Sequence, residues 1–262
     1  MRKSFELHAF SPAHFATYFA RFNMVSYMDV SNNYPILISS GNQFKTSQIR
    51  PCQVAIVSYG TGNLASLEES FAAIGAEAYL AANPDDLSRA DALVLPGVGH
   101  FGTALSALHD SEFLLVLRHL ILAGVPTLGI CLGFHLLTKA SEESAGMDGL
   151  GLLPFVTELL RPHDTIQYKV PHMGWNNISK LVGESILLKD ISHEKQIFYY
   201  SNSYGVPASS DLCFPHACFE HDQYWLAILE KDNIFGVQFH PEKSRSQGLQ
   251  VLRNFLSRVN IL

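Results

Sequence analysis

The pattern of apolar and polar residues predicts alternating strands and helices from residue 54 onward. Residues 54–57 are apolar without alternation, as in a strand covered on both faces, and apolar residues then recur at helical spacing from Leu64 to Ile74, where Gly75 ends the helix. Further strands are expected at 76–80, 92–95 and 127–130, a short turn or helix at 85–88, and a crossover helix at 113–122. Such alternation over short connections indicates an α/β fold with a doubly wound, mostly parallel central sheet and helices on both faces.

Past Gly149 the pattern changes to shorter pieces rich in β-forming residues. These pieces are residues 156–160, 168–170, 196–200, 213–219, 225–229 and 235–239. Their spacing predicts a smaller antiparallel sheet that flanks the main one. Residues 247–259 carry apolar side chains along one helical face, so an amphipathic helix is expected to end the domain and pack on the sheet.

The first fifty or so residues have a different texture, rich in Phe, His, Tyr, Asn and Ser. Aromatic residues between Phe15 and Phe22 have the spacing of one helical face, which is compatible with a short docking helix. The alternative is an upstream extension read from a start codon placed too early, with Met24 or Met28 as the true start. We therefore divide the chain into an N-terminal extension, residues 1–52, either disordered or a docking segment, and a domain of residues 53–262.

Composition excludes several classes of function. The 262 residues are 47% hydrophobic and 16% charged, which is ordinary for a globular chain with a sizeable core. The net charge of -6 gives no basic footprint for nucleic acid, and no apolar stretch reaches the length of a membrane span. Four cysteines form no disulfide framework, which favours a reducing, cytoplasmic compartment. Cys213 and Cys218, with histidines nearby, lack the second ligand pair of a structural zinc site, so neither a metal nor another cofactor is expected.

Cys131 lies in the tight turn Gly-Ile-Cys-Leu-Gly, between the strand expected at 127–130 and a helix expected to run through Leu137 to Lys139 and beyond. Glycines on both sides leave room for a strained turn that lifts a nucleophile out of the sheet. The start of the helix supplies N–H groups and partial positive charge, which activate a thiol and hold an oxyanion. The alternative is a small buried cysteine in a core turn.

A second glycine-rich turn, Pro-Gly-Val-Gly at residues 96–99, also follows an expected strand. Backbone N–H groups in such a loop can face a ligand closely, as an oxyanion hole requires, and the alternative is a plain connection to a helix. The turn Gly60-Thr61-Gly62 resembles a dinucleotide-binding loop, but Ala65 takes the third glycine position and Glu77 comes too early for the ribose-binding acid. A nucleotide-dependent oxidoreductase is therefore the weakest of the functions considered.

His240 follows another expected strand, and Glu242 comes two residues later across Pro241. A carboxylate fixes the tautomer of an imidazole and stabilises its protonated form, and proline restricts the turn between the two side chains. Ligands of doubly wound sheets gather at the carboxyl ends of the strands, where Cys131 and His240 both lie. The sequence therefore predicts an acyl-transfer triad of Cys131 as nucleophile, His240 as base and acid, and Glu242 as the residue that orients it.

The motifs around these residues resemble the triad-type, class I glutamine amidotransferases, which hydrolyse glutamine to glutamate and ammonia. The resemblance rests on Gly-Ile-Cys-Leu-Gly at 129–133, Pro-Gly-Val-Gly at 96–99 and His-Pro-Glu at 240–242. Within that family, three further motifs resemble the glutaminase subunits of imidazole glycerol phosphate synthases: Tyr-Gly-x-Gly-Asn at 59–63, Val-Pro-His-Met-Gly-Trp-Asn at 170–176 and Gln-Phe-His-Pro-Glu-Lys-Ser at 238–244. The resemblance covers residue 53 to the C-terminus.

The resemblance implies a role for each matching residue. Cys131 attacks the glutamine amide to form a thioester, while Val98 or Gly99 and Leu132 supply the oxyanion hole. Asn63, Trp175 and Lys243 match positions at the interface with a (β/α)8-barrel synthase of the cyclase type, which receives the ammonia for histidine biosynthesis. Trp175 has an alternative interpretation as a core residue. The remaining matches are to substrate-binding positions, namely Gly97, Gly133, His135, Asn202, Ser203 and Tyr204.

Two departures from the family pattern leave alternatives open. The family carries Met-Gln where this chain has Phe134-His135, and that glutamine helps to bind the substrate; it carries His-Ser-Tyr where this chain has Asn202-Ser203-Tyr204. These changes suit a divergent second copy that supplies ammonia to another pathway, such as amidation of a surface sugar. They are also compatible with a non-catalytic interaction subunit.

Overall fold

The computed structural model describes residues 24–29, 34–39, 52–60, 62–208 and 212–259. The chain divides into two units, Met1–Arg50 and Pro51–Leu262. In the first unit, strands β1 (Met24–Asp29) and β2 (Tyr34–Ser39) pair as an antiparallel hairpin. The helical face expected between Phe15 and Phe22 lies outside the described residues.

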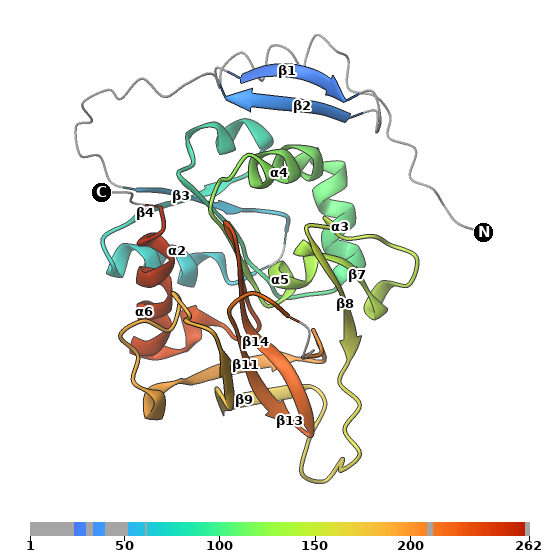
Figure 1. Ribbon diagram of the computed structural model, residues 1–262, viewed down its shortest axis with the longest axis vertical. Coiled ribbons are helices and arrows are strands. Elements are labelled where there is room, and N and C mark those ends of the chain that lie inside the picture. The colour runs from blue at the N-terminus through green and yellow to red at the C-terminus, as the bar shows by residue number, and fades with distance from the viewer. Residues whose placement is uncertain (1–23, 30–33, 40–51, 61, 209–211, 260–262) are drawn as a thin grey trace. The chain divides into compact units, whose positions relative to one another are not determined.

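The main sheet of the second unit contains eight strands among the described residues, in the order β10-β13-β14-β15-β6-β5-β3-β4 (Figure 1). Strands β15, β6, β5, β3 and β4 run parallel, and β10, β13 and β14 extend the sheet with antiparallel pairs. Their bounds are β3 Gln53–Val57, β4 Glu77–Ala81, β5 Ala92–Leu95, β6 Thr127–Ile130, β10 Lys180–Val182, β13 His216–His221, β14 Gln223–Lys231 and β15 Ile234–Val237.

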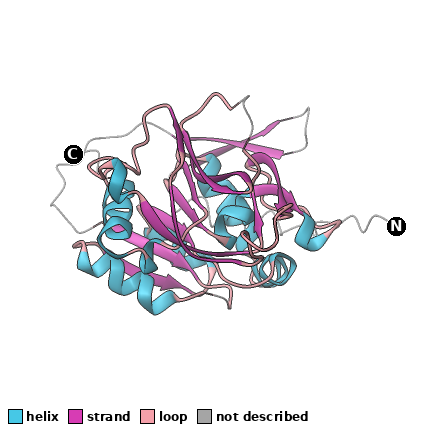
Figure 2. Ribbon diagram, turned by 90° about the horizontal axis from the view of Figure 1, so that it is seen from below, coloured by secondary structure: helices cyan, strands magenta, loops and turns pink. Residues whose placement is uncertain are grey.

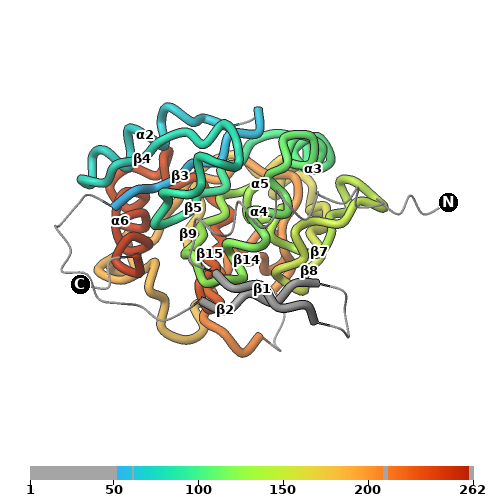
Figure 3. Tube along the Cα trace, turned by 90° about the horizontal axis from the view of Figure 1, so that it is seen from above, coloured from blue at the N-terminus to red at the C-terminus, as the bar shows by residue number. Residues whose placement is uncertain are grey.

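Helices cover both faces of this sheet (Figure 2). Helices α2 and α6 pack against each other on one side of the parallel strands, and α3 and α4 pack together on the other (Figure 3). Phe71 of α2 and Phe255 of α6 are fully buried, as is Phe113 of α4, because each helix turns its apolar stripe to the sheet. The helices are α2 Leu64–Ala73, α3 Phe101–Asp110, α4 Phe113–Leu122, α5 Leu132–Leu137 and α6 Arg245–Leu256.

Two small sheets flank the main one. Strands β9 and β11 form an antiparallel ribbon, and β7, β8 and β12 form a three-stranded sheet. Their bounds are β7 Thr138–Ser141, β8 Leu153–Leu159, β9 His172–Asn177, β11 Ile197–Asn202 and β12 Tyr204–Gly205. Four 3-10 turns complete the described part: η1 Pro84–Arg89, η2 Glu142–Ser144, η3 His193–Lys195 and η4 Pro241–Lys243.

The predicted α/β architecture is confirmed, with four differences in detail. Residues 168–170 form no strand; strand β9 begins at His172, after Pro171, which has no N–H to donate to a ladder. The helix after Cys131 ends at Leu137, where the Thr138 hydroxyl donates to the carbonyl of His135 and the chain turns into β7. Helix α3 begins at Phe101, just after the second glycine-rich turn, where the apolar pattern predicts no helix. The expected antiparallel flanking sheet is present as the pair β9 and β11, while strands β10, β13 and β14 extend the main sheet itself.

No helix in the described part of the chain is both long enough and apolar enough to span a membrane.

Candidate functional site

Cys131 occupies a strained turn between β6 and α5. Its φ of 48° and ψ of -107° lie outside the regions that side-chain-bearing residues prefer, which is the backbone geometry of a nucleophile elbow. The Cys131 N–H donates to the Val237 carbonyl at 2.7 Å, so the turn is fastened to the end of β15. Helix α5 has only six residues, and its dipole is correspondingly short.

Two glycines let the second glycine-rich turn approach this elbow. A Cβ atom at Gly133 would lie 1.9 Å from the Leu95 carbonyl oxygen, and one at Gly97 would lie 2.5 Å from the Gly133 nitrogen. Atoms without a bond between them do not approach so closely, so only glycine fits at either position. The two glycines therefore allow the backbone of residues 96–99 to lie directly against the turn that carries Cys131.

A side-chain hydrogen bond holds the loop that is expected to supply the oxyanion hole. The Tyr59 hydroxyl donates to the Pro96 carbonyl, and Gly99 takes a φ of 119°, which favours glycine. Among the described residues, none accepts a hydrogen bond from the backbone N–H of Val98 or Gly99. Leu132 begins α5 immediately after Cys131. These N–H groups have the chemistry of an oxyanion hole, since donors at a helix start and a glycine loop are unused by the fold.

His240 and Glu242 form a buried pair at the end of β15. Glu242 Oε1 lies 2.8 Å from His240 Nδ1, and the two side chains are only 3% and 1% exposed. The His240 N–H donates to the Tyr199 carbonyl, which ties the turn to β11. Nε2 of His240 is buried and has no well-formed hydrogen bond to any residue that the structure describes, although the Cys131 side chain is close enough to stabilise a charge on the ring.

The electrostatics of the pair favour a protonated imidazole. Burial of the His240 ring disfavours its protonation, but the Cys131 and Glu242 side chains outweigh this effect and raise the pKa of His240 to about 10. The Cys131 thiol thus meets the His240 imidazole and the Glu242 carboxylate, more than a hundred residues later in the sequence, at one end of the sheet. Register explains the meeting, because Ile130 and Val237 are partners in the parallel pair of β6 and β15.

The residues predicted to bind substrate divide into two groups. Gly97 and Gly133 lie against the elbow, as described above. His135 is buried, and its Nε2 lies 2.8 Å from Gln238 Oε1. Burial lowers the pKa of His135 to about 4, with the Gln238 hydrogen bond acting in the opposite direction, so the ring is neutral near pH 7.

The second group follows the end of β11. Asn202 is buried and donates through Nδ2 to the Tyr204 carbonyl at 2.9 Å, while its Oδ1 has no hydrogen-bond partner among the described residues. The Ser203 carbonyl accepts from Leu160, and Tyr204 is half-buried. This segment lies beside the elbow, since the Ser201 carbonyl is 4.0 Å from the Cys131 sulfur. An unpaired buried amide oxygen is a group available to a ligand donor.

Trp175, Ile197, Lys243 and Arg245 form a surface, here called the ribbon face, over the outer side of β9 and β11. Trp175 is 43% exposed, so its interpretation as a core residue is wrong. The Arg245 guanidinium lies 4.7 Å above the Trp175 ring, and Lys243 Nζ lies 5.7 Å from the Tyr199 ring.

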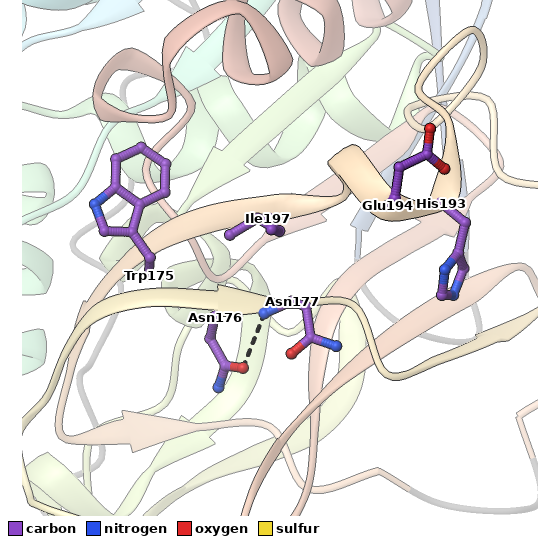
Figure 4. A pocket seen from close by; sticks show the side chains of 6 residues that line it. All are labelled: Trp175, Asn176, Asn177, His193, Glu194 and Ile197. Atoms are coloured by element: carbon purple, nitrogen blue, oxygen red, sulfur yellow. Dashed lines mark hydrogen bonds between the residues drawn. The ribbon is translucent and has the colours of Figure 1, made fainter.

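Two hollows flank Trp175 on the ribbon face. The larger, of about 470 Å³, is lined by Trp175, Asn176, Asn177, His193, Glu194 and Ile197 (Figure 4). Figure 4 shows Trp175 and Asn176 projecting to opposite sides of β9, as alternation along a strand requires. The smaller, of about 220 Å³, lies between Trp175, Ile197, Arg245 and Gln247. Asn63, at the start of α2, is also exposed.

The prediction from sequence missed two side chains that touch this site. Gln238 Nε2 lies 3.6 Å from the Cys131 sulfur, and the Tyr59 hydroxyl supports the loop beside it. Gln238 lies between the end of strand β15 and the candidate base His240, and this position was the available signal. Within the described residues, no group of three or more His, Cys, Asp or Glu side chains is arranged to hold a metal ion.

Comparison with known proteins gives one family. Residues 55–259 match the family described as Glutamine amidotransferase class-I. The protein named imidazole glycerol phosphate synthase subunit HisH from Methanothermobacter thermautotrophicus is 43% identical over 203 residues, which cover 78% of this chain and 97% of that protein. The protein of the same name from Bacillus cereus is 37% identical over 202 residues, with coverage of 77% and 93%.

Solved structures share the fold at low identity. A structure titled PurLQS from Thermotoga maritima superimposes with a TM-score of 0.59 at 18% identity and covers 81% of this chain and 100% of that chain. A structure titled glutamine amidotransferase gives a TM-score of 0.58 at 16% identity, with coverage of 79% and 99%.

Proposed function

Since the chain belongs to the class-I glutamine amidotransferase family, we propose that it is the glutaminase subunit of an imidazole glycerol phosphate synthase in histidine biosynthesis. It hydrolyses L-glutamine to glutamate and ammonia and passes the ammonia to a synthase subunit. The observation that supports this most is the meeting of the buried His240–Glu242 pair with Cys131 at the strained elbow.

In the proposed first half-reaction, the Cys131 thiolate attacks the side-chain carbonyl carbon of glutamine. The N–H groups of Leu132 and of Val98 or Gly99 hold the negative charge that develops on the carbonyl oxygen. His240 then gives its proton to the nitrogen of the intermediate, the carbon–nitrogen bond breaks, and ammonia leaves a thioester on Cys131. The raised pKa of His240 suits this step, because the ring is already protonated near neutral pH.

In the second half-reaction, neutral His240 takes a proton from water, and the oxygen of that water adds to the thioester carbonyl. The intermediate collapses with cleavage of the carbon–sulfur bond, so glutamate leaves and the thiolate and imidazolium are restored. Glu242 keeps the ring oriented through Nδ1 and stabilises its charge in both half-reactions. Glutamine plus water thus becomes glutamate plus ammonia, without a cofactor.

The proposed partner is a (β/α)8-barrel synthase of the cyclase type that docks on the ribbon face and near Asn63. An exposed tryptophan with a stacked arginine is the kind of anchor that interfaces use, and two hollows beside it can receive side chains of a partner. The face connects directly to the site, because β11 carries both Ile197 and the carbonyl that binds His240. Docking there can act on the triad through β11.

The remaining parts of the proposal concern organisation. Residues 53–262 form the glutaminase domain and residues 1–52 an extension, a division that the family match over residues 55–259 supports. The protein works in the cytoplasm, where its cysteines stay reduced. In the described part of the chain, Cys131, Cys213 and Cys218 take part in no disulfide.

The test measures glutamate release from L-glutamine by the full chain, with and without a cyclase-type synthase subunit. We expect release that rises when the synthase is added and disappears in Cys131→Ala. Release that persists in Cys131→Ala would remove the proposed mechanism. A glutamine-mimicking electrophile provides a second readout: no adduct at Cys131, even with the synthase present, would instead favour a non-catalytic interaction subunit.

Genes adjacent to the coding sequence separate the pathways. A cyclase-barrel gene within a histidine operon agrees with the proposal, whereas a neighbouring sugar-modification cluster would favour the divergent second copy.

A further inference from the structure

A chain of two hydrogen bonds runs from His135 through Gln238 to the sulfur of Cys131. His135 Nε2 lies 2.8 Å from Gln238 Oε1, and Gln238 Nε2 lies 3.6 Å from Cys131 Sγ. All three side chains are buried, with Gln238 fully enclosed. The reaction proposed above makes no use of either His135 or Gln238 in this arrangement.

The fold holds these three residues in register. Because Ile130 and Val237 are paired across β6 and β15, the residues that follow them, Cys131 and Gln238, leave the sheet side by side. Backbone hydrogen bonds hold both residues in place. The Gln238 N–H donates to the Ala227 carbonyl at 2.9 Å, and the His135 N–H donates to the Cys131 carbonyl at 3.1 Å. The contact is therefore a consequence of sheet and helix geometry and not of a flexible surface side chain.

Chemistry fixes the direction of both hydrogen bonds when the sulfur is a thiolate. A thiolate only accepts, so the amide of Gln238 must turn its NH₂ toward Cys131 and its oxygen toward His135. The oxygen also only accepts, so His135 must carry its proton on Nε2. A neutral ring can do so, and the lowered pKa of His135 keeps the ring neutral near pH 7. With the amide reversed, its oxygen would face the sulfur and repel negative charge.

We propose that His135 and Gln238 are positioning residues for the nucleophile: Gln238 donates a hydrogen bond to the Cys131 thiolate, and His135 locks the Gln238 amide in the orientation that permits it. This inference rests on the proposed function only for its catalytic consequence. His240 also stabilises the thiolate, so the sulfur has both an imidazolium and an amide donor as neighbours.

The experiment titrates the thiolate directly in the full chain. The ultraviolet absorbance of the Cys131 thiolate is followed against pH as the difference from Cys131→Ala, with the exposed Cys213 replaced by serine in both proteins. Removal of a hydrogen bond to a charged group is expected to raise the midpoint by about one pH unit or more in Gln238→Met, which keeps the side-chain volume. His135→Leu is expected to raise it in the same direction.

Two further variants separate positioning from general damage. His135→Gln restores an N–H donor and is expected to return the midpoint to within a few tenths of a unit of the parent. His216→Gln is the matched control, because His216 is an equally buried histidine on β13 that bonds the Phe214 carbonyl and does not touch the sulfur. Its midpoint is expected to stay with the parent. If His135→Leu does not fold, Gln238→Met carries the test alone.

Equal midpoints in the parent and Gln238→Met would overturn the inference, as would a shift of the same size in His216→Gln. Glutamate release with the synthase present is measured on the same proteins. A shifted midpoint in a chain that releases no glutamate would refute the proposed function and leave the positioning role standing. Normal glutamate release by the parent, with no shift of the midpoint in Gln238→Met, would refute the positioning role and leave the proposed function standing.

Discussion

Substitution of Gly133 by alanine tests how the elbow is built. The added Cβ would lie 1.9 Å from the Leu95 carbonyl oxygen and 2.6 Å from the Leu95 carbonyl carbon. Both neighbours are backbone atoms at the end of a central strand, so no side-chain rotation relieves the overlap. The elbow and the end of β5 must separate by roughly 1 Å, because a packed interior offers no void to absorb the methyl group.

This displacement sets the size of the expected effects. Overpacking of a rigid core site costs about 1–3 kcal/mol of the free energy of unfolding, and a backbone clash belongs at or above the upper end. A movement of this size also misplaces the thiol relative to the His240 ring and the 96–99 loop, which we expect to lower kcat/KM for glutamine by roughly 100-fold or more.

The free energy of unfolding is measured by urea denaturation, and kcat/KM by glutamate release with the synthase present. Gly205→Ala is the control, because Gly205, in strand β12, is buried like Gly133. Its Cβ would approach the Trp225 ring to 3.2 Å, which a small shift of that side chain relieves, while Gln238 Oε1 at 3.6 Å and Leu160 Cδ1 at 3.7 Å would be in ordinary van der Waals contact. We expect the control to lose less than about 1 kcal/mol. An unchanged denaturation midpoint and full activity in Gly133→Ala would refute this account of the elbow.

Three further predictions concern the triad and the ribbon face. Glu242→Gln removes the carboxylate 2.8 Å from His240, and kcat is expected to fall by about 100- to 10,000-fold in the glutamate assay while the chain stays folded by circular dichroism; a fall of less than twofold would exclude the orienting role. Because the pKa of His240 is raised in the folded state, its contribution to stability is fully present below about pH 6.5 and is lost as the pH rises toward about 10. Urea denaturation should therefore show the parent losing its advantage over Glu242→Gln across that range, and parallel curves would contradict the shift. Trp175→Ala should weaken synthase binding by about 30-fold or more in calorimetry. Tyr224→Ala, which truncates a similarly exposed aromatic side chain on β14, should bind like the parent. Equal losses of affinity in the two variants would contradict an interface on the ribbon face.

The sequence by itself determined the local features of this protein. Apolar periodicity set the parallel strands and the helices α2, α4 and α6, because each buries a stripe or a face whose spacing is visible in the chain. The elbow at Cys131 was predictable, since its strained turn needs glycines within two residues on either side. The His240–Glu242 pair was predictable for the same reason, because two residues across a proline turn suffice to form it.

Only the tertiary structure decided which of these local features meet. Ile130 and Val237 become partners through the register of two strands far apart in the sequence, and no local pattern records that register. The same pairing brings Gln238 to the Cys131 sulfur, a contact that apolar periodicity cannot indicate for a buried polar residue. The exposure of Trp175 likewise depends on β9 pairing with β11 in a separate ribbon, since a tryptophan in a β-rich stretch is equally compatible with a core. Long-range strand pairing is a property of the packed sheet. It brings together the residues of the site, which the local motifs identify only separately.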